Sequence, residues 1–104
     1  MRTTFLSNIY PIILNKYVKN ELKNYFGKME IKNIIKKTNI GYKNMMKNHQ
    51  KNIEVDKNTY RNLCVNTYFI NIYKNIENEI SHDVYKKIQE NIIKNSKILT
   101  VKNK

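Results

Sequence analysis

The sequence predicts an all-α protein, a small bundle of about four antiparallel helices in a single domain over residues 1–104. Three observations support this. Apolar residues recur at three- and four-residue spacing along most of the chain, as in amphipathic helices. Residues that interrupt helices are scarce, with two glycines and one proline. No segment shows the sustained period-two alternation of a half-buried strand.

The first helix is expected near residues 8–26. An Asn8 cap would place Pro11 in the first turn, where a missing N–H is tolerated. Gly27 follows the apolar stripe, at a position where a left-handed residue would end the helix. The stripe consists of Ile13, Leu14, Tyr17, Val18, Leu22, Tyr25 and Phe26.

The second helix is expected near residues 28–48. Gly41 lies within its stripe and costs about 1 kcal/mol relative to alanine. This glycine indicates either a close helix crossing or a break in the helix, and we favour the crossing. Residues 49–58, "HQKNIEVDKN", have no clean period and form the longest linker. The stripe consists of Ile31, Ile34, Ile35, Thr38, Tyr42, Met45 and Met46.

The third helix, near residues 58–77, is expected to be the most buried. It carries two interleaved apolar stripes, and a helix that is apolar on most of its circumference belongs at the centre of a bundle. Asp56 or Asn58 would cap it. Residues expected in the core of the whole domain are Leu14, Val18, Leu22, Ile34, Ile35, Leu63, Tyr68, Phe69, Ile72 and Ile88.

The fourth helix is expected at residues 82–96, after a turn that ends at Ser81. Ser81 is a typical N-cap residue, and Asp83 would place a negative charge near the positive end of the helix dipole. Ile80 and Tyr85 have the spacing of a hydrophobic staple. Residues 97–104 are expected to form a frayed tail, with a short strand as the alternative.

The net charge of +12 raises the hypothesis of a nucleic-acid or anionic-membrane partner. The cations are 18 lysines and two arginines, Arg2 and Arg61, whereas proteins that clamp phosphates favour arginine. Lysine, asparagine and isoleucine make up half of the chain, which is typical of an AT-rich, low-GC genome. We therefore favour solvated lysine faces over nucleic-acid binding.

Two lysine ridges nevertheless stand out as candidate anion-binding sites. Lys16, Lys19 and Lys23 share one face of the first helix and form the candidate anion-binding ridge. The second helix carries a similar row, which consists of Lys28, Lys32, Lys36, Lys43 and Lys47. The eight tyrosines could offer stacking platforms for single strands, but most follow the apolar stripes and are expected in the core.

The residues that usually carry chemistry are scattered. His49, His82 and Cys64 lack the spacing of metal ligands, so neither a metal nor a cofactor is expected. Cys64 lies on an apolar stripe and is expected to be a buried structural thiol. The acidic pairs Glu54/Asp56 and Glu77/Glu79 fall in linkers, and no glycine-rich phosphate loop is present. The catalytic residues are therefore unknown.

The chain is expected in the cytoplasm and without a membrane span. A single cysteine cannot form an internal disulfide, which fits a reducing compartment. No apolar run approaches the roughly 18 residues that a membrane helix requires. The N-terminal "MRTTFLSNIYPIILNK" is interpreted as part of the first helix rather than as a targeting peptide.

Two segments resemble the N-terminal helical part of the L-2-amino-thiazoline-4-carboxylic acid hydrolase family. In "ELKNYFGKMEIKNIIKKTNIGYKNMM", Phe26-Gly27 and Tyr42 match an aromatic-glycine pair and a later tyrosine. In "TYFINIYKNIENEISHDVYKKI", Tyr73-Lys74 matches a pair that ends an apolar helix. The resemblance spans about residues 12–93. The chain departs from the family at "HQKNIEVDKN", where members carry a Gly-Gly-Asn-type stretch.

The resemblance implies a C–N hydrolase that opens the thiazoline ring toward cysteine. It supplies no active-site residue, because the family's cysteine-containing second part would follow Lys104. We therefore expect a truncated or N-terminal module that is inactive alone. The alternative is a basic helical module that binds nucleic acid or a protein partner. A C-terminal domain or a second copy is expected to cover Tyr and Ile side chains of the first and third helices.

Overall fold

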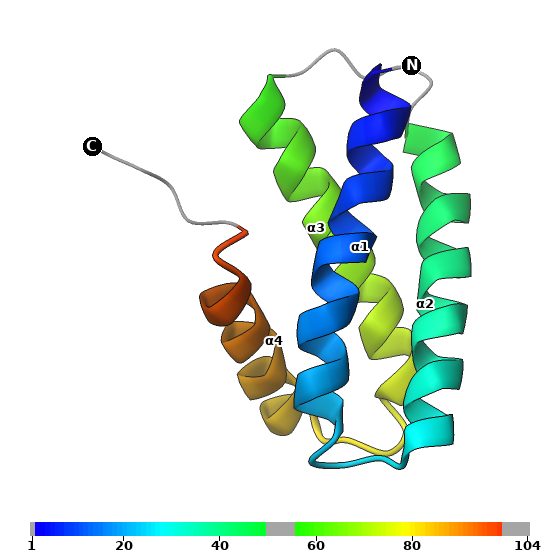
Figure 1. The fold of residues 1–104 in the computed structure, drawn as a ribbon, viewed down its shortest axis with the longest axis vertical. Helices are drawn as coiled ribbons and strands as arrows, with labels where there is room; N and C mark the ends of the chain where they lie inside the picture. Colours follow the sequence, from blue (N-terminus) through cyan, green and yellow to red (C-terminus); the bar gives the residue numbers. More distant parts are fainter. Residues whose placement is uncertain (1, 50–55, 99–104) are drawn as a thin grey trace.

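The four predicted helices are all present, and they form an up-and-down bundle (Figure 1). The structure, a computed structural model, describes residues 2–49 and 56–98. The helices are α1 (Arg2–Leu22), α2 (Lys28–His49), α3 (Lys57–Ile76) and α4 (His82–Ser96). The described part of the chain contains no strand. Helix α1 packs mainly against α4, and α2 packs mainly against α3.

Helix α1 starts earlier and ends earlier than predicted, at Arg2 and Leu22 instead of 8 and 26. Pro11 therefore lies inside the helix and not in its first turn. Proline has no N–H to donate to the carbonyl four residues before it, here that of Ser7. The Tyr42 hydroxyl of α2 donates to this same carbonyl at 2.6 Å, in a buried position. A side chain from another helix thus replaces the donor that Pro11 lacks.

Gly27 does not end α1 in a left-handed conformation, because neither glycine has a positive φ. It caps α2 instead. The Gly27 carbonyl accepts from the Ile31 N–H, and the Glu30 carboxylate accepts from the Gly27 N–H at 2.9 Å. This arrangement is half of a capping box. Tyr25, predicted in the stripe of the first helix, falls in the preceding turn and is 48% exposed.

Gly41 marks a close crossing of α2 and α3, as predicted. A Cβ atom at this position would collide with the side-chain oxygen of Asn71 on α3. Asn71 is buried, and its amide donates to the Thr67 carbonyl at 2.8 Å. Nearby, the Asn75 amide donates to the Thr38 hydroxyl at 3.2 Å and so joins the two helices. The absence of a side chain at Gly41 lets this polar seam form.

Helix α3 is the most buried, as predicted, with nine buried residues among its twenty, but α1 is the helix that packs against all three others. Eight of the ten predicted core residues are buried, while Ile35 and Leu63 are only partly buried because each lies at the edge of its stripe. Asp56 is the N-cap, and its carboxylate accepts from the Thr59 N–H at 2.7 Å. That hydrogen bond holds the pKa of the Asp56 carboxyl below its ordinary value.

Helix α4 begins and ends as predicted. The Ser81 hydroxyl accepts from the Val84 N–H, and Asp83 lies in the first turn. Ile80 and Tyr85, the expected staple pair, are both buried. Lys97 ends the helix with φ 57°, in the left-handed region. The predicted tail beyond Ile98 and most of the predicted linker lie outside the described residues.

Candidate functional site

The residues that could carry chemistry do not come together. Cys64 is fully buried in the core, as predicted, and burial raises the pKa of its thiol. His82 begins α4, and its ring packs edge-on against the Tyr73 ring, with 5.9 Å between the ring centroids. His49, predicted in a linker, is the last residue of α2. Among the described residues, no group of three His, Cys, Asp or Glu side chains could hold a metal ion.

The surroundings of Cys64 make it a poor nucleophile. Burial is the main cause of its raised pKa, and nearby Tyr42 and Tyr60 hydroxyls only partly oppose it. A reactive cysteine needs a lowered pKa and access to solvent. Cys64 has neither, so the structure supports its interpretation as a structural thiol.

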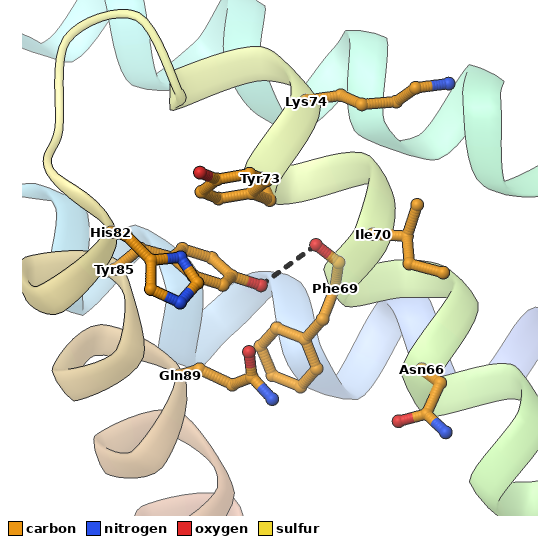
Figure 2. A pocket seen from close by; sticks show the side chains of 8 residues that line it. All are labelled: Asn66, Phe69, Ile70, Tyr73, Lys74, His82, Tyr85 and Gln89. Carbon is orange, nitrogen blue, oxygen red and sulfur yellow. Dashed lines mark hydrogen bonds between the residues drawn. The ribbon is translucent and has the colours of Figure 1, made fainter.

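A first hollow of about 440 Å³ opens between α3 and α4 (Figure 2). Tyr73, His82 and Tyr85 gather on one side of it, and the Tyr85 hydroxyl donates to the Phe69 carbonyl at 3.0 Å. The Lys74 ammonium points away from this aromatic cluster. The rings mainly bridge two helices whose backbones diverge, since α3 and α4 make few backbone contacts. This hollow is thus a space that aromatic side chains fill only partly between two diverging helices, and it shows no cluster of catalytic groups among its described lining residues.

A second hollow, about 290 Å³, lies between α1 and α2 and is lined by both polar and apolar side chains. Asn15, on its α1 side, accepts from the Tyr68 hydroxyl at 2.6 Å. Asn39, on its α2 side, has a buried side-chain oxygen with no hydrogen-bond partner among the described residues. Asn15 and Asn39 give this hollow polar groups that can hydrogen-bond ordered water.

A third hollow is a groove of about 530 Å³ between the end of α1 and the start of α2, and we call it the lysine groove. Its apolar lining, which we call its floor, consists of buried Ile31, partly buried Ile35 and Met29, whose side chain is 71% exposed. Four lysines line it: Lys19 from α1, Lys23 from the turn after α1, and Lys28 and Lys32 from α2. The turn at Gly27 reverses the chain, so the two walls face each other.

The lysine groove is electrostatically one-sided. None of its lining residues is acidic. The nearest acids in sequence have other hydrogen-bond partners, since Glu30 accepts from the Gly27 N–H and Glu21 accepts from the Asn91 amide on α4. The four groove lysines make no ion pair with any residue that the structure describes. The groove therefore combines an apolar floor with four lysines that are not in ion pairs with described residues.

The sequence analysis singled out these lysines, but it did not predict that they line one groove. Lys16, Lys19 and Lys23 are all exposed, but Lys23 lies in the turn after α1, and only Lys19 and Lys23 line the groove. The Lys16 ammonium lies 6.0 Å from the Tyr17 ring centroid instead. Exposed Met29 was missed, because it lies off the apolar stripe of α2. An isolated apolar residue between lysines was its only signal.

Comparison with protein-family models, with curated proteins and with solved structures finds no match for this chain. The resemblance to the thiazoline hydrolase family therefore stays a prediction. No helix within the described residues is both long enough and apolar enough to cross a membrane.

Proposed function

We propose that this chain is a non-catalytic helical binding module that holds an acidic partner in the lysine groove. The observation that carries the proposal is the convergence of four lysines, from α1, the turn after it and α2, on one apolar floor. Lysines that serve only to keep a protein in solution can be spread over its surface and have no reason to gather around one groove. Opposed positive walls, by contrast, attract and orient an anionic ligand.

The proposal is tested by locating where an anion binds. Poly-glutamate is titrated into the isotope-labelled chain at low salt, and amide chemical shifts are followed by NMR. Any protein of this charge binds a polyanion at low salt, so the test depends on where the chemical shifts change and not on whether binding occurs. We expect the largest shifts in residues 19–35. Equal shifts along all lysine-bearing faces would contradict the proposal.

Two variants with the same charge change sharpen the test. In the groove variant, Lys19, Lys23, Lys28 and Lys32 are replaced by Gln. In the control variant, four exposed lysines elsewhere are replaced, namely Lys43, Lys47, Lys86 and Lys94. The groove variant should lose at least about tenfold in affinity, because each lost contact contributes a fraction of a kcal/mol to 1 kcal/mol. The control should lose markedly less, and an equal loss would indicate unspecific attraction.

A second proposal, from the sequence resemblance, is an N-terminal module of a thiazoline-ring hydrolase. The described residues bring no nucleophile, base and orienting group together, so they supply no support for catalysis by this chain. Incubation with 2-amino-thiazoline-4-carboxylate and detection of carbamoyl-cysteine or cysteine tests it. We expect no turnover. Turnover that a Cys64→Ser variant loses would restore the hydrolase proposal.

A further inference from the structure

We infer that the occupant of the lysine groove is a short acidic amphipathic helix of a protein partner. This inference rests on the proposed function and names its ligand. The spacing of the lysines is the first reason. Lys19 and Lys23 are four residues apart on one wall, and Lys28 and Lys32 are four residues apart on the other. Lys28 and Lys32, both on α2, therefore lie about 6 Å apart along the helix axis, whereas Lys23 follows the end of α1.

Acidic residues four apart on a partner helix have the same 6 Å repeat. A helix that lies lengthwise in the groove can thus pair acids on both of its flanks with the two walls. The α2 wall, from Lys28 to Ile35, is about 10 Å long, which corresponds to two helical turns. Two turns are enough for one or two apolar anchors on the face between the acids.

The floor of the groove is the second reason. Ile31 and Ile35, four residues apart on α2, form an apolar strip beside Lys28 and Lys32, and exposed Met29 lines the groove from the other side of these lysines. An amphipathic helix buries its apolar face on such a strip, which is the usual mode of helix-in-groove recognition. Met29 suits this role, because its flexible and polarizable side chain adapts to differently shaped partners.

The same floor disfavours nucleic acid. A phosphate backbone offers no apolar group to cover Met29, and no aromatic side chain lines the groove as a stacking platform for bases. All four cations are lysines, which lack the planar fork of arginine that matches phosphate. A flat anionic bilayer fits less well than a rod, since Ile31 and Ile35 are buried or partly buried in the hollow between the two helices.

The test compares two peptides of identical composition at physiological salt. One places leucines along a single helical face with glutamates on both flanks, and the other scrambles the order so that no such face exists. Fluorescence anisotropy measures affinity, and circular dichroism measures the helix that the peptide gains on binding. We expect the amphipathic peptide to bind at least about tenfold more tightly and to gain helix.

Two single substitutions on α2 locate the apolar contact. Met29→Ser removes an exposed side chain from the floor, whereas Ile40→Ser removes a side chain that is 53% exposed and lies outside the groove. Because both positions are exposed, both variants should fold. Met29→Ser should lower the affinity for the amphipathic peptide about fivefold or more, and Ile40→Ser should leave it nearly unchanged.

The outcomes separate this inference from the proposed function. Equal binding of the two peptides, or tighter binding of a single-stranded oligothymidylate, would overturn the amphipathic helix while the lysine groove remained an anion site. Poly-glutamate shifts spread over all lysine-bearing faces would overturn the groove itself, and with it this inference.

Discussion

At the scale of single residues, the contact between Tyr42 and Ser7 shows how one hydroxyl supports a helix that contains a proline. Pro11 supplies no N–H to the Ser7 carbonyl, and the Tyr42 hydroxyl occupies that place at 2.6 Å. Burial raises the pKa of Tyr42 above its ordinary value, which keeps the hydroxyl protonated as a donor. The contact joins segments 35 residues apart in the sequence.

Replacement of Tyr42 by Phe should lower the free energy of unfolding by about 1–2 kcal/mol, because a buried hydrogen bond is lost. Urea unfolding measures this. In a Pro11→Ala background the new backbone N–H can donate to the same carbonyl, so the cost of Tyr42→Phe should fall. The double-mutant cycle isolates this coupling. Additive effects of the two substitutions would show that the hydroxyl does not replace the missing donor.

Buried tyrosines should make the protein sensitive to alkali. Burial raises the pKa values of Tyr42, Tyr68 and Tyr85, whereas in the unfolded chain they ionise near pH 10. Above about pH 10 the unfolded state therefore binds fewer protons than the native state, and the free energy of unfolding falls as pH rises. Each tyrosine contributes up to about 1.4 kcal/mol per pH unit.

Urea unfolding at a series of pH values measures this slope, and tyrosinate absorbance follows ionisation in the folded protein. A Tyr68→Phe variant, in which one of the three buried phenols is absent, should have a smaller slope. Ionisation of all eight tyrosines near pH 10 in the folded state would contradict the prediction.

At the scale of helices, sequence patterns predicted the buried face of each helix and the bounds of α4 well, but the bounds of the first helix poorly. The caps Asp56 and Ser81 have local signals, since a side chain that accepts from a backbone N–H three residues later needs only its own turn. The start of α1 depends on Tyr42, a distant residue that no local pattern around Pro11 reveals. Gly27 was assigned to the wrong helix, because a glycine between two helices suits either end.

Gly41 should tolerate no side chain. Gly41→Ala should destabilise the protein by about 1–3 kcal/mol, because overpacking against Asn71 outweighs the higher helix propensity of alanine. Gly27 is the matched control, since a Cβ there would meet only ordinary contact at 3.7 Å from Glu30. Thermal unfolding compares the two variants. A Gly41→Ala protein as stable as the wild type would show that the α2–α3 crossing adjusts freely.

At the scale of the whole molecule, the candidate site arises from the reversal of the chain between α1 and α2. The sequence showed two lysine ridges separately, and each alone resembles an ordinary solvated face. Only the bundle places Lys19 and Lys23 opposite Lys28 and Lys32 across an apolar floor. The pairing of ridges depends on helix rotation and crossing, which the 3.6-residue period does not determine.

Association of two copies through the first and third helices stays a prediction. Ile12 on α1 and Ile70 on α3 are 70% and 47% exposed, which leaves apolar surface for a partner copy. We expect light scattering to give twice the 12.6 kDa chain mass and the double variant Ile12→Ser/Ile70→Ser to be monomeric. Ile40→Ser is the control. A wild-type chain that is monomeric at high concentration would contradict association.

The tyrosine that completes α1 also sets an order of assembly during synthesis. A growing polypeptide reaches Pro11 long before residue 42 has been made, so early in translation the upstream turns lack their later support. Helix upstream of the proline should consolidate only after α2 has emerged and docked. Hydrogen exchange on stalled nascent chains should therefore show slow-exchanging amides before residue 11 only once the chain extends well past residue 42.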